Sequence, residues 1–116
     1  MTLTVIGLGY VGLPLALEFA RAGCRVIGLD IDPDKIQRLQ AGRCYLAHVS
    51  AADLPTLVSQ DRLQPTTDFA QLRQAEAVLI CVPTPITENR EPDLQYIVST
   101  SRAISQHLQR GQLIVL

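Results

Sequence analysis

The sequence predicts an α/β domain built on a doubly wound parallel sheet. Short apolar runs rich in Val, Ile and Leu alternate with segments of helical period, as in strand-helix-strand units with right-handed crossovers. Hydrophobic residues make up 47% of the 116 residues, but aromatic residues only 4%. We therefore expect an aliphatic core, as in buried parallel strands that are covered by helices.

The first half of the chain alternates between strand and helix twice. Its predicted elements are a strand over 3–8, a helix over 11–22, a strand over 25–30 and a helix from Asp32 to Gly42. Gly23 stands where a C-terminal glycine cap belongs. Asp32 followed by Pro33 is a typical helix start, with the acid as cap and the proline in the first turn.

The second half is predicted to continue the same alternation. Its elements are a helix over 54–58 led by Ser50-Ala51-Ala52-Asp53, strands over 63–66, 77–82 and 113–116, and a short helix over 68–74. A longer helix is expected after Pro92. Its apolar residues should lie largely on one side, and they are Leu94, Ile97, Val98, Ile104 and Leu108. A domain seldom ends on an unprotected strand. We therefore expect residues 1–116 to be the first domain of a longer protein, cut after about five strands.

Composition and charge exclude several classes of partner. The 10 Lys and Arg nearly balance the 11 Asp and Glu, so no basic field favours a nucleic-acid partner. Cys24, Cys44 and Cys81 form no CxxC pair and no metal-ligand spacing, which predicts a cytoplasmic protein without a metal site. No signal-peptide pattern is present, and no apolar run reaches the roughly 20 residues of a membrane span.

Three glycines form the motif that predicts a ligand. Gly7, Gly9 and Gly12 directly follow the first strand and open the first helix, which is where a dinucleotide-binding fingerprint belongs. Gly7 allows a tight turn, Gly9 lets the backbone approach a pyrophosphate, and Gly12 lets helix and strand pack closely. The amides of Tyr10 and Val11 are expected to face the phosphates at the positive end of the helix dipole. The fold class is therefore predicted to be Rossmann-type.

A carboxylate after the second strand predicts which dinucleotide binds. Asp30 lies eighteen residues beyond Gly12. A carboxylate there accepts the hydroxyls of the adenosine ribose and repels a 2′-phosphate, so NAD is expected rather than NADP. Lys35, on the next helix, is expected near the same ribose, where its charge partly offsets that preference.

A third candidate segment lies after the strand over 77–82. Thr84 stands between Pro83 and Pro85, and ligands of doubly wound sheets bind beyond the carboxyl ends of the strands. A hydroxyl held between two stiff residues is placed to bond a ribose or phosphate oxygen, so Pro83 and Thr84 join the expected site. The alternative is that Pro-Thr-Pro only ends the strand.

The chain resembles the UDP-glucose/GDP-mannose dehydrogenase family. The resemblance starts in Val5-Ile6-Gly7-Leu8-Gly9-Tyr10-Val11-Gly12-Leu13-Pro14 and continues in Asp30, Pro33 and Lys35. The later segments Val82-Pro83-Thr84-Pro85 and Glu91-Pro92-Asp93-Leu94 resemble the branch that oxidises UDP-N-acetylhexosamines. The resemblance extends through essentially all 116 residues.

This resemblance implies a function. It implies a four-electron, NAD-dependent oxidation of a nucleotide sugar at C6, in polysaccharide biosynthesis, with UDP-N-acetylglucosamine, UDP-N-acetylmannosamine or UDP-glucose as substrate. It implies cofactor contacts from Tyr10, Val11, Asp30, Lys35 and Thr84. The family's catalytic cysteine belongs to a Phe-Gly-Gly-x-Cys segment that is absent here, so we expect no catalytic residue and no turnover from this chain alone. Members of the family are usually dimers, so a homodimer is a further expectation.

Two alternatives stay open. Related 6-phosphogluconate and β-hydroxyacid dehydrogenases share the glycine loop, and a stand-alone nucleotide-binding module uses the same fold without catalysis. The three cysteines are expected to behave as small hydrophobic residues. His48 and His107 are expected at the surface or its boundary and not as acid-base groups.

Overall fold

One parallel sheet organises the part of the chain that the computed structural model describes, which is residues 1–47, 49, 51–81 and 95–115. Its five strands lie in the order β3-β2-β1-β4-β5, and every neighbouring pair is parallel. They are β1 (Thr2–Ile6), β2 (Arg25–Leu29), β3 (Leu63–Thr66), β4 (Ala77–Ile80) and β5 (Leu113–Val115). The predicted α/β class with a doubly wound parallel sheet is confirmed.

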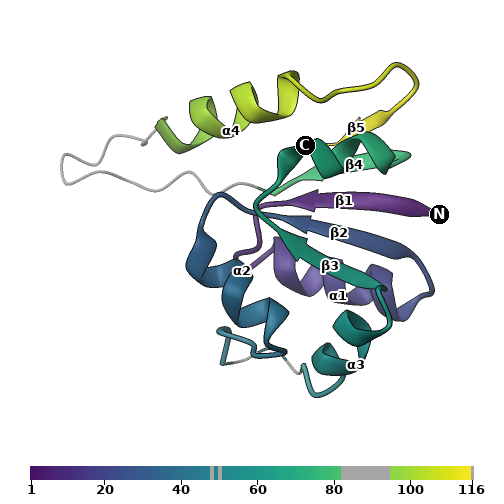
Figure 1. The fold of residues 1–116 in the computed structure, drawn as a ribbon, viewed down its shortest axis with the longest axis vertical. Helices are drawn as coiled ribbons and strands as arrows, with labels where there is room; N and C mark the ends of the chain where they lie inside the picture. The colour runs from purple at the N-terminus through teal and green to yellow at the C-terminus, as the bar shows by residue number, and fades with distance from the viewer. Residues whose placement is uncertain (48, 50, 82–94, 116) are drawn as a thin grey trace.

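Helices cover both faces of this sheet (Figure 1). One face carries α1 (Gly12–Arg21), α2 (Pro33–Gln40) and α3 (Leu54–Ser59), and the other carries the 3₁₀ helix η1 (Phe69–Gln74) and α4 (Gln95–Ser105). Alternate residues of each strand face opposite sides. In β1, Leu3 and Val5 therefore pack on the side of α1, whereas Ile6 packs with Leu72 of η1. The core is mainly aliphatic on both sides, as expected, and Phe69 of η1 adds a buried aromatic ring on one side.

Local sequence signals explain where several elements begin and end. The side chain of Asp32 caps α2 by accepting a 3.0 Å hydrogen bond from the amide of Asp34, with Pro33 in the first turn. Gly23 has a φ of +101°, the left-handed conformation that ends α1 without the strain of a Cβ. Pro65 lies in β3, an edge strand, where a missing backbone donor is tolerated.

Three expectations about elements and exposure are corrected. Val98 is 44% exposed, so it does not share the buried side of α4, and Leu108, which is 43% exposed, lies beyond the end of that helix at Ser105. That side is defined by Thr100 and Ile104, one helical turn apart, and Val98 lies about 200° around the helix from Thr100. Cys81 lies one residue beyond β4 and is only partly buried, so it is not inside the strand as expected. Leu94 and His48 lie outside the described residues.

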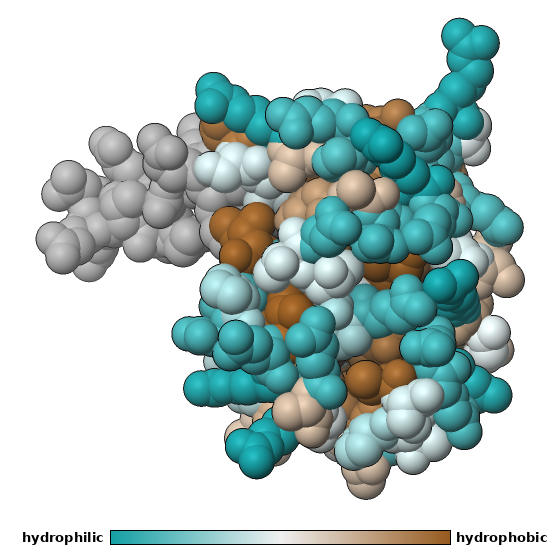
Figure 2. All heavy atoms as spheres, viewed as in Figure 1, coloured by the Kyte–Doolittle hydropathy of each residue, from teal (hydrophilic) through white to brown (hydrophobic). Residues whose placement is uncertain are grey.

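The face of the molecule seen in Figure 2 is mainly hydrophilic. Figure 2 shows that apolar residues reach the face in view only in small separate patches. Within the described ranges, no helix has the length and apolar character of a bilayer-spanning segment.

Candidate functional site

The strand register brings three chain positions to one point at the edge of the sheet. Ile6, the last residue of β1, pairs with Leu29 of β2 on one side and with Ile80 of β4 on the other. The residues that follow these strand ends are Gly7, Asp30 and Cys81. The sheet reverses its winding direction at β1, so this edge is the switch point where doubly wound sheets bind ligands.

The turn from β1 to α1 depends on two glycines. Gly7 has a φ of +91°, and its amide donates a 2.8 Å hydrogen bond to the carbonyl of Leu29. A Cβ on Gly12 would lie 1.6 Å from the carbonyl oxygen of Gly7 and 3.3 Å from the Cβ of Cys81. A side chain at position 12 would therefore displace backbone. Because glycine has none, α1 can pack closely against the end of β1.

Gly9 has the opposite surroundings. A Cβ built on Gly9 would have no heavy atom within 4 Å, so the absence of a side chain there is not required by packing inside the chain. Its carbonyl accepts a 3.1 Å hydrogen bond from the amide of Leu13, which places Gly9 at the start of the helical ladder. The open side of Gly9 is the kind of cradle in which a phosphate group approaches the backbone.

The N-terminus of α1 has features that favour an anion. Val11 occupies the N-cap position, its side chain makes no capping hydrogen bond, and the first turn contains no acidic residue. The amides at such a terminus have no acceptor within their own helix. The side chains of Tyr10 and Val11 are 73% and 68% exposed, so they do not fill the turn. The helix dipole thus presents a positive end that an anionic group can approach.

Asp30 is buried at the adjacent strand end, with only 1% of its surface exposed. Its Oδ2 atom accepts a hydrogen bond from the amide of Leu8 at 2.8 Å, and its Oδ1 atom accepts one from the amide of Asp32 at 3.0 Å. These two bonds fix the carboxylate at the carboxyl end of β2, beside the glycine loop. The sequence did not predict that Asp30 also ties the glycine loop to β2.

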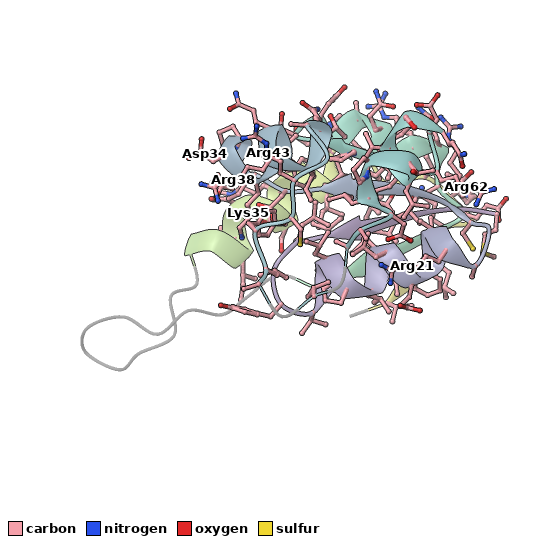
Figure 3. The ribbon with its side chains drawn as sticks, turned by 90° about the horizontal axis from the view of Figure 1, so that it is seen from below. Arg21, Asp34, Lys35, Arg38, Arg43 and Arg62 are labelled. Carbon is pink, nitrogen blue, oxygen red and sulfur yellow. The ribbon has the colours of Figure 1, made fainter. Side chains whose placement is uncertain are left out.

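Lys35 and Tyr45 form the neighbouring part of the site. The Nζ atom of Lys35 lies 6.0 Å from the centroid of the Tyr45 ring, a cation–π distance. The hydroxyl of Tyr45 donates a hydrogen bond to the carbonyl oxygen of Leu8 in the glycine loop. Figure 3 shows Lys35 at one end of the molecule, where Asp34, Arg38 and Arg43 also lie. Tyr45 lies in a stretch without helical or strand period, and no sequence signal pointed to it.

A second residue that the sequence analysis missed is Gly28. It lies inside β2, and a Cβ there would come within 3.2 Å of one side-chain carbon of Leu8 and 3.4 Å of another. Glycine at this position therefore leaves room for the buried side chain of Leu8. A glycine inside a strand often indicates such a close approach, so this signal was present in the sequence.

Three expectations remain: the contacts from Pro83 and Thr84, the inert cysteine, and the lack of a metal site. Pro83 and Thr84 lie outside the described residues. Burial raises the pKa of the Cys81 thiol, which disfavours the thiolate that nucleophilic chemistry needs. Among the described residues, no group of three or more His, Cys, Asp or Glu side chains is arranged to hold a metal ion.

The surroundings of the glycine loop fit a dinucleotide. Gly9 supplies an open backbone cradle, the end of α1 supplies a positive dipole, and Asp30 supplies a negative charge at the end of β2. Pyrophosphate and ribose hydroxyls are the ligand groups that match these three features.

Comparisons with known proteins agree with this chemistry. All 116 residues match the model of the UDP-glucose/GDP-mannose dehydrogenase family, NAD binding domain. The chain is 43% identical over 119 residues to an NDP-N-acetyl-D-galactosaminuronic acid dehydrogenase from Ralstonia nicotianae, and 37% identical over 116 residues to the UDP-N-acetyl-D-mannosamine dehydrogenase of Escherichia coli. Each match covers 99% of this chain but only 27% of the relative.

A solved structure gives the same result. A ternary complex of GDP-mannose dehydrogenase from Pseudomonas aeruginosa superimposes with a TM-score of 0.85 at 32% identity. The match covers 95% of this chain and 26% of that protein. The chain thus spans about a quarter of the length of these relatives. It belongs to the UDP-glucose/GDP-mannose dehydrogenase family as its NAD-binding domain, with NAD as its cofactor.

Proposed function

We propose that this chain is the cofactor domain of a nucleotide-sugar 6-dehydrogenase and holds NAD across the carboxyl edge of β1, β2 and β4. Gly7, Gly9 and Gly12 shape the turn, and the amides of Tyr10 and Val11 receive the pyrophosphate. Asp30 receives the adenosine ribose, with Lys35 beside it. Pro83 and Thr84 complete the proposed contacts from the segment after β4.

The observation that supports this proposal most strongly is the contrast between Gly9 and Gly12. A Cβ on Gly12 would meet the Gly7 carbonyl oxygen at 1.6 Å, whereas a Cβ on Gly9 would meet nothing within 4 Å. Packing within the chain therefore accounts for glycine at position 12 but not at position 9. A pyrophosphate lying against the backbone accounts for position 9.

The substrate that we propose for the whole protein is a UDP-sugar, with a UDP-N-acetylhexosamine favoured over UDP-glucose. The relatives named for N-acetylated sugars support this choice, since they match 99% of the chain at 37% and 43% identity. Bound NAD supplies a hydride acceptor, and oxidation of the C6 alcohol to the acid transfers four electrons and so reduces two NAD per sugar. We place this reaction in polysaccharide biosynthesis in the cytoplasm and propose a homodimer for the whole protein.

The chain by itself is proposed to bind NAD without oxidising a sugar. The raised pKa of Cys81 and its packing against the core cluster on the α1 side support a packing role for this residue. Since the chain spans about 27% of its relatives, we propose that the catalytic cysteine and the sugar site belong to the rest of the protein.

Calorimetric titration of the chain with NAD, NADP and ATP tests the cofactor assignment. NAD should bind most tightly, because the Asp30 carboxylate repels the 2′-phosphate of NADP. Binding of NADP that equals or exceeds that of NAD would contradict the role of Asp30. The substrate assignment is tested separately, by measuring NADH formation by the whole protein with UDP-N-acetylmannosamine, UDP-N-acetylglucosamine and UDP-glucose. A preference for UDP-glucose would overturn it.

A further inference from the structure

Leu8 is held in the glycine loop by its side chain and by both of its backbone polar groups. Its side chain is 1% exposed and lies in the space that Gly28 leaves in β2. Its amide donates to Asp30 Oδ2 at 2.8 Å, and its carbonyl oxygen accepts from the hydroxyl of Tyr45. Both polar groups of one loop residue are thus held by side chains 22 and 37 positions away.

The hydrogen bond from Tyr45 has a consequence for Gly9. In a trans peptide the carbonyl oxygen of one residue and the N–H of the next point in opposite directions. The structure describes no cis peptide bond, so fixing the Leu8 oxygen also fixes the direction of the Gly9 N–H. The peptide after Gly9 is fixed as well, because the Gly9 oxygen accepts from the amide of Leu13. The orientation of Gly9 is therefore fixed on one side by the hydrogen bond from Tyr45 and on the other by the hydrogen bond from Leu13.

The ring of Tyr45 is itself held in place. It packs against the core cluster on the α1 side of the sheet, and the Nζ atom of Lys35 lies 6.0 Å from its centroid. A cation over an aromatic face is attracted by the negative charge density of the ring. Lys35, in the first turn of α2, thus contacts Tyr45, and Tyr45 in turn bonds the glycine loop at Leu8.

We propose that Tyr45 is a positioning residue for the cofactor: its hydroxyl orients the Leu8–Gly9 peptide so that the open side of Gly9 is ready for the pyrophosphate. This inference rests on the proposed NAD site. It assigns to Tyr45 a contribution to affinity that acts through the backbone and involves no contact with NAD. A loop that is held before binding loses less conformational freedom when the ligand arrives, which increases affinity.

Tyr45→Phe is the direct test, since it removes the hydroxyl and keeps the ring over which Lys35 lies. Loss of one hydrogen bond should weaken NAD binding about fivefold. Ser59→Ala is the matched control, because Ser59 also donates its hydroxyl to a backbone carbonyl, that of Thr56 in α3. The control should leave NAD affinity unchanged. Amide hydrogen exchange at Leu8, whose buried N–H is bonded to Asp30 and whose carbonyl accepts from Tyr45, should accelerate in Tyr45→Phe and not in Ser59→Ala.

The outcomes separate this inference from the proposed function. If the unaltered chain binds NAD and Tyr45→Phe binds it equally well, the positioning role is wrong and the NAD site stands. If Tyr45→Phe lowers the unfolding midpoint and speeds exchange throughout the sheet without changing NAD affinity, Tyr45 is only structural and the inference is again wrong. If the unaltered chain binds no NAD, the proposed function itself fails.

Discussion

The Oδ2 atom of Asp30 accepts a 2.8 Å hydrogen bond from the backbone amide of Leu8, 22 positions earlier in the chain. Asp30 therefore joins the end of β2 to the loop between β1 and α1. The carboxylate that we assign to the ribose also shapes the loop that we assign to the pyrophosphate. A change at this position should alter both the preference for NAD and the stability of the fold.

Asp30→Asn should weaken NAD binding about tenfold, because a neutral amide forms weaker hydrogen bonds with ribose hydroxyls than a carboxylate does. The same change removes the repulsion of a 2′-phosphate, so the ratio of NADP to NAD affinity should rise. The unfolding free energy should fall by about 1–2 kcal/mol, since the Leu8 and Asp32 amides lose a charged acceptor. Titration calorimetry and urea unfolding measure these effects.

Asp34→Asn provides the control for Asp30→Asn. It also removes one negative charge, but from an exposed side chain in the first turn of α2. It should change the ratio of the two affinities much less. An equal change in both variants would mean that the general charge of this region, and not Asp30, sets the preference.

Gly12→Ala should destabilise the fold by about 3 kcal/mol or more, because backbone must move to make room for a methyl group. The new Cβ would lie 1.6 Å from the Gly7 carbonyl oxygen and 3.3 Å from the Cβ of Cys81. Urea unfolding monitored by circular dichroism gives this value. A loss below about 1 kcal/mol, the size of an ordinary substitution, would contradict the tight packing of this turn.

The ion pair between Arg21 of α1 and Asp53 before α3 should stabilise the fold in a pH-dependent manner. Arg21 binds both carboxylate oxygens, at 2.7 and 2.8 Å, and this hydrogen bonding lowers the pKa of Asp53. A carboxyl group with a lowered folded-state pKa stabilises the fold fully above its unfolded pKa of about 3.9 and loses that contribution as the pH falls through the folded-state pKa. The pair is solvent-exposed, so its contribution at neutral pH should be about 0.5 kcal/mol.

A double-mutant cycle with Arg21→Met and Asp53→Asn measures that contribution at pH 7 and at acidic pH. The coupling energy should be present at pH 7 and disappear in acid. Glu18→Gln is the comparison, because the Oε1 atom of Glu18 lies 2.9 Å from Arg21 and the Glu18 side chain is 71% exposed. A coupling energy that persists in acid would show that the carboxylate charge is not its source.

Thr4→Val should raise the unfolding free energy by about 1 kcal/mol, because it replaces a buried hydroxyl with an apolar group of the same shape. Thr4 lies in β1 with 0% exposure, and its Oγ1 atom has no hydrogen-bond partner among the described residues. Thr2→Val, at a partly exposed position of the same strand, should change stability less. A loss of stability in Thr4→Val would mean that the hydroxyl has a partner in the native protein.

Much of this fold could be predicted because its signals are local. The alternation of apolar runs with helical segments predicted all five strands, and Asp32, Pro33 and Gly23 predicted helix boundaries that the structure confirms. Strands β1, β2 and β4 end earlier than predicted on the carboxyl side, whereas β3 ends at Thr66 as predicted. Leu8 is buried like a strand residue, but it belongs to the turn, and hydrophobicity alone does not distinguish the two environments.

The features that could not be predicted depend on contacts between distant parts of the chain. Tyr45 bonds a carbonyl 37 positions away, and the stretch around it has no period from which a face could be assigned. Asp53 was expected among the residues that cap α3, but its side chain makes no cap and binds Arg21 of α1 instead. Val98 was assigned to the wrong side of α4 because a five-residue apolar set fits more than one helical face.

The central claim is that a pyrophosphate lies against Gly9, and titration of NAD into Gly9→Ala tests it most directly. A Cβ at this position meets nothing within 4 Å in the chain, so the variant should unfold at the same urea concentration as the unaltered protein. The methyl group would occupy the space of the phosphates, and NAD affinity should fall about tenfold or more. Unchanged NAD affinity in a folded Gly9→Ala chain would contradict the account.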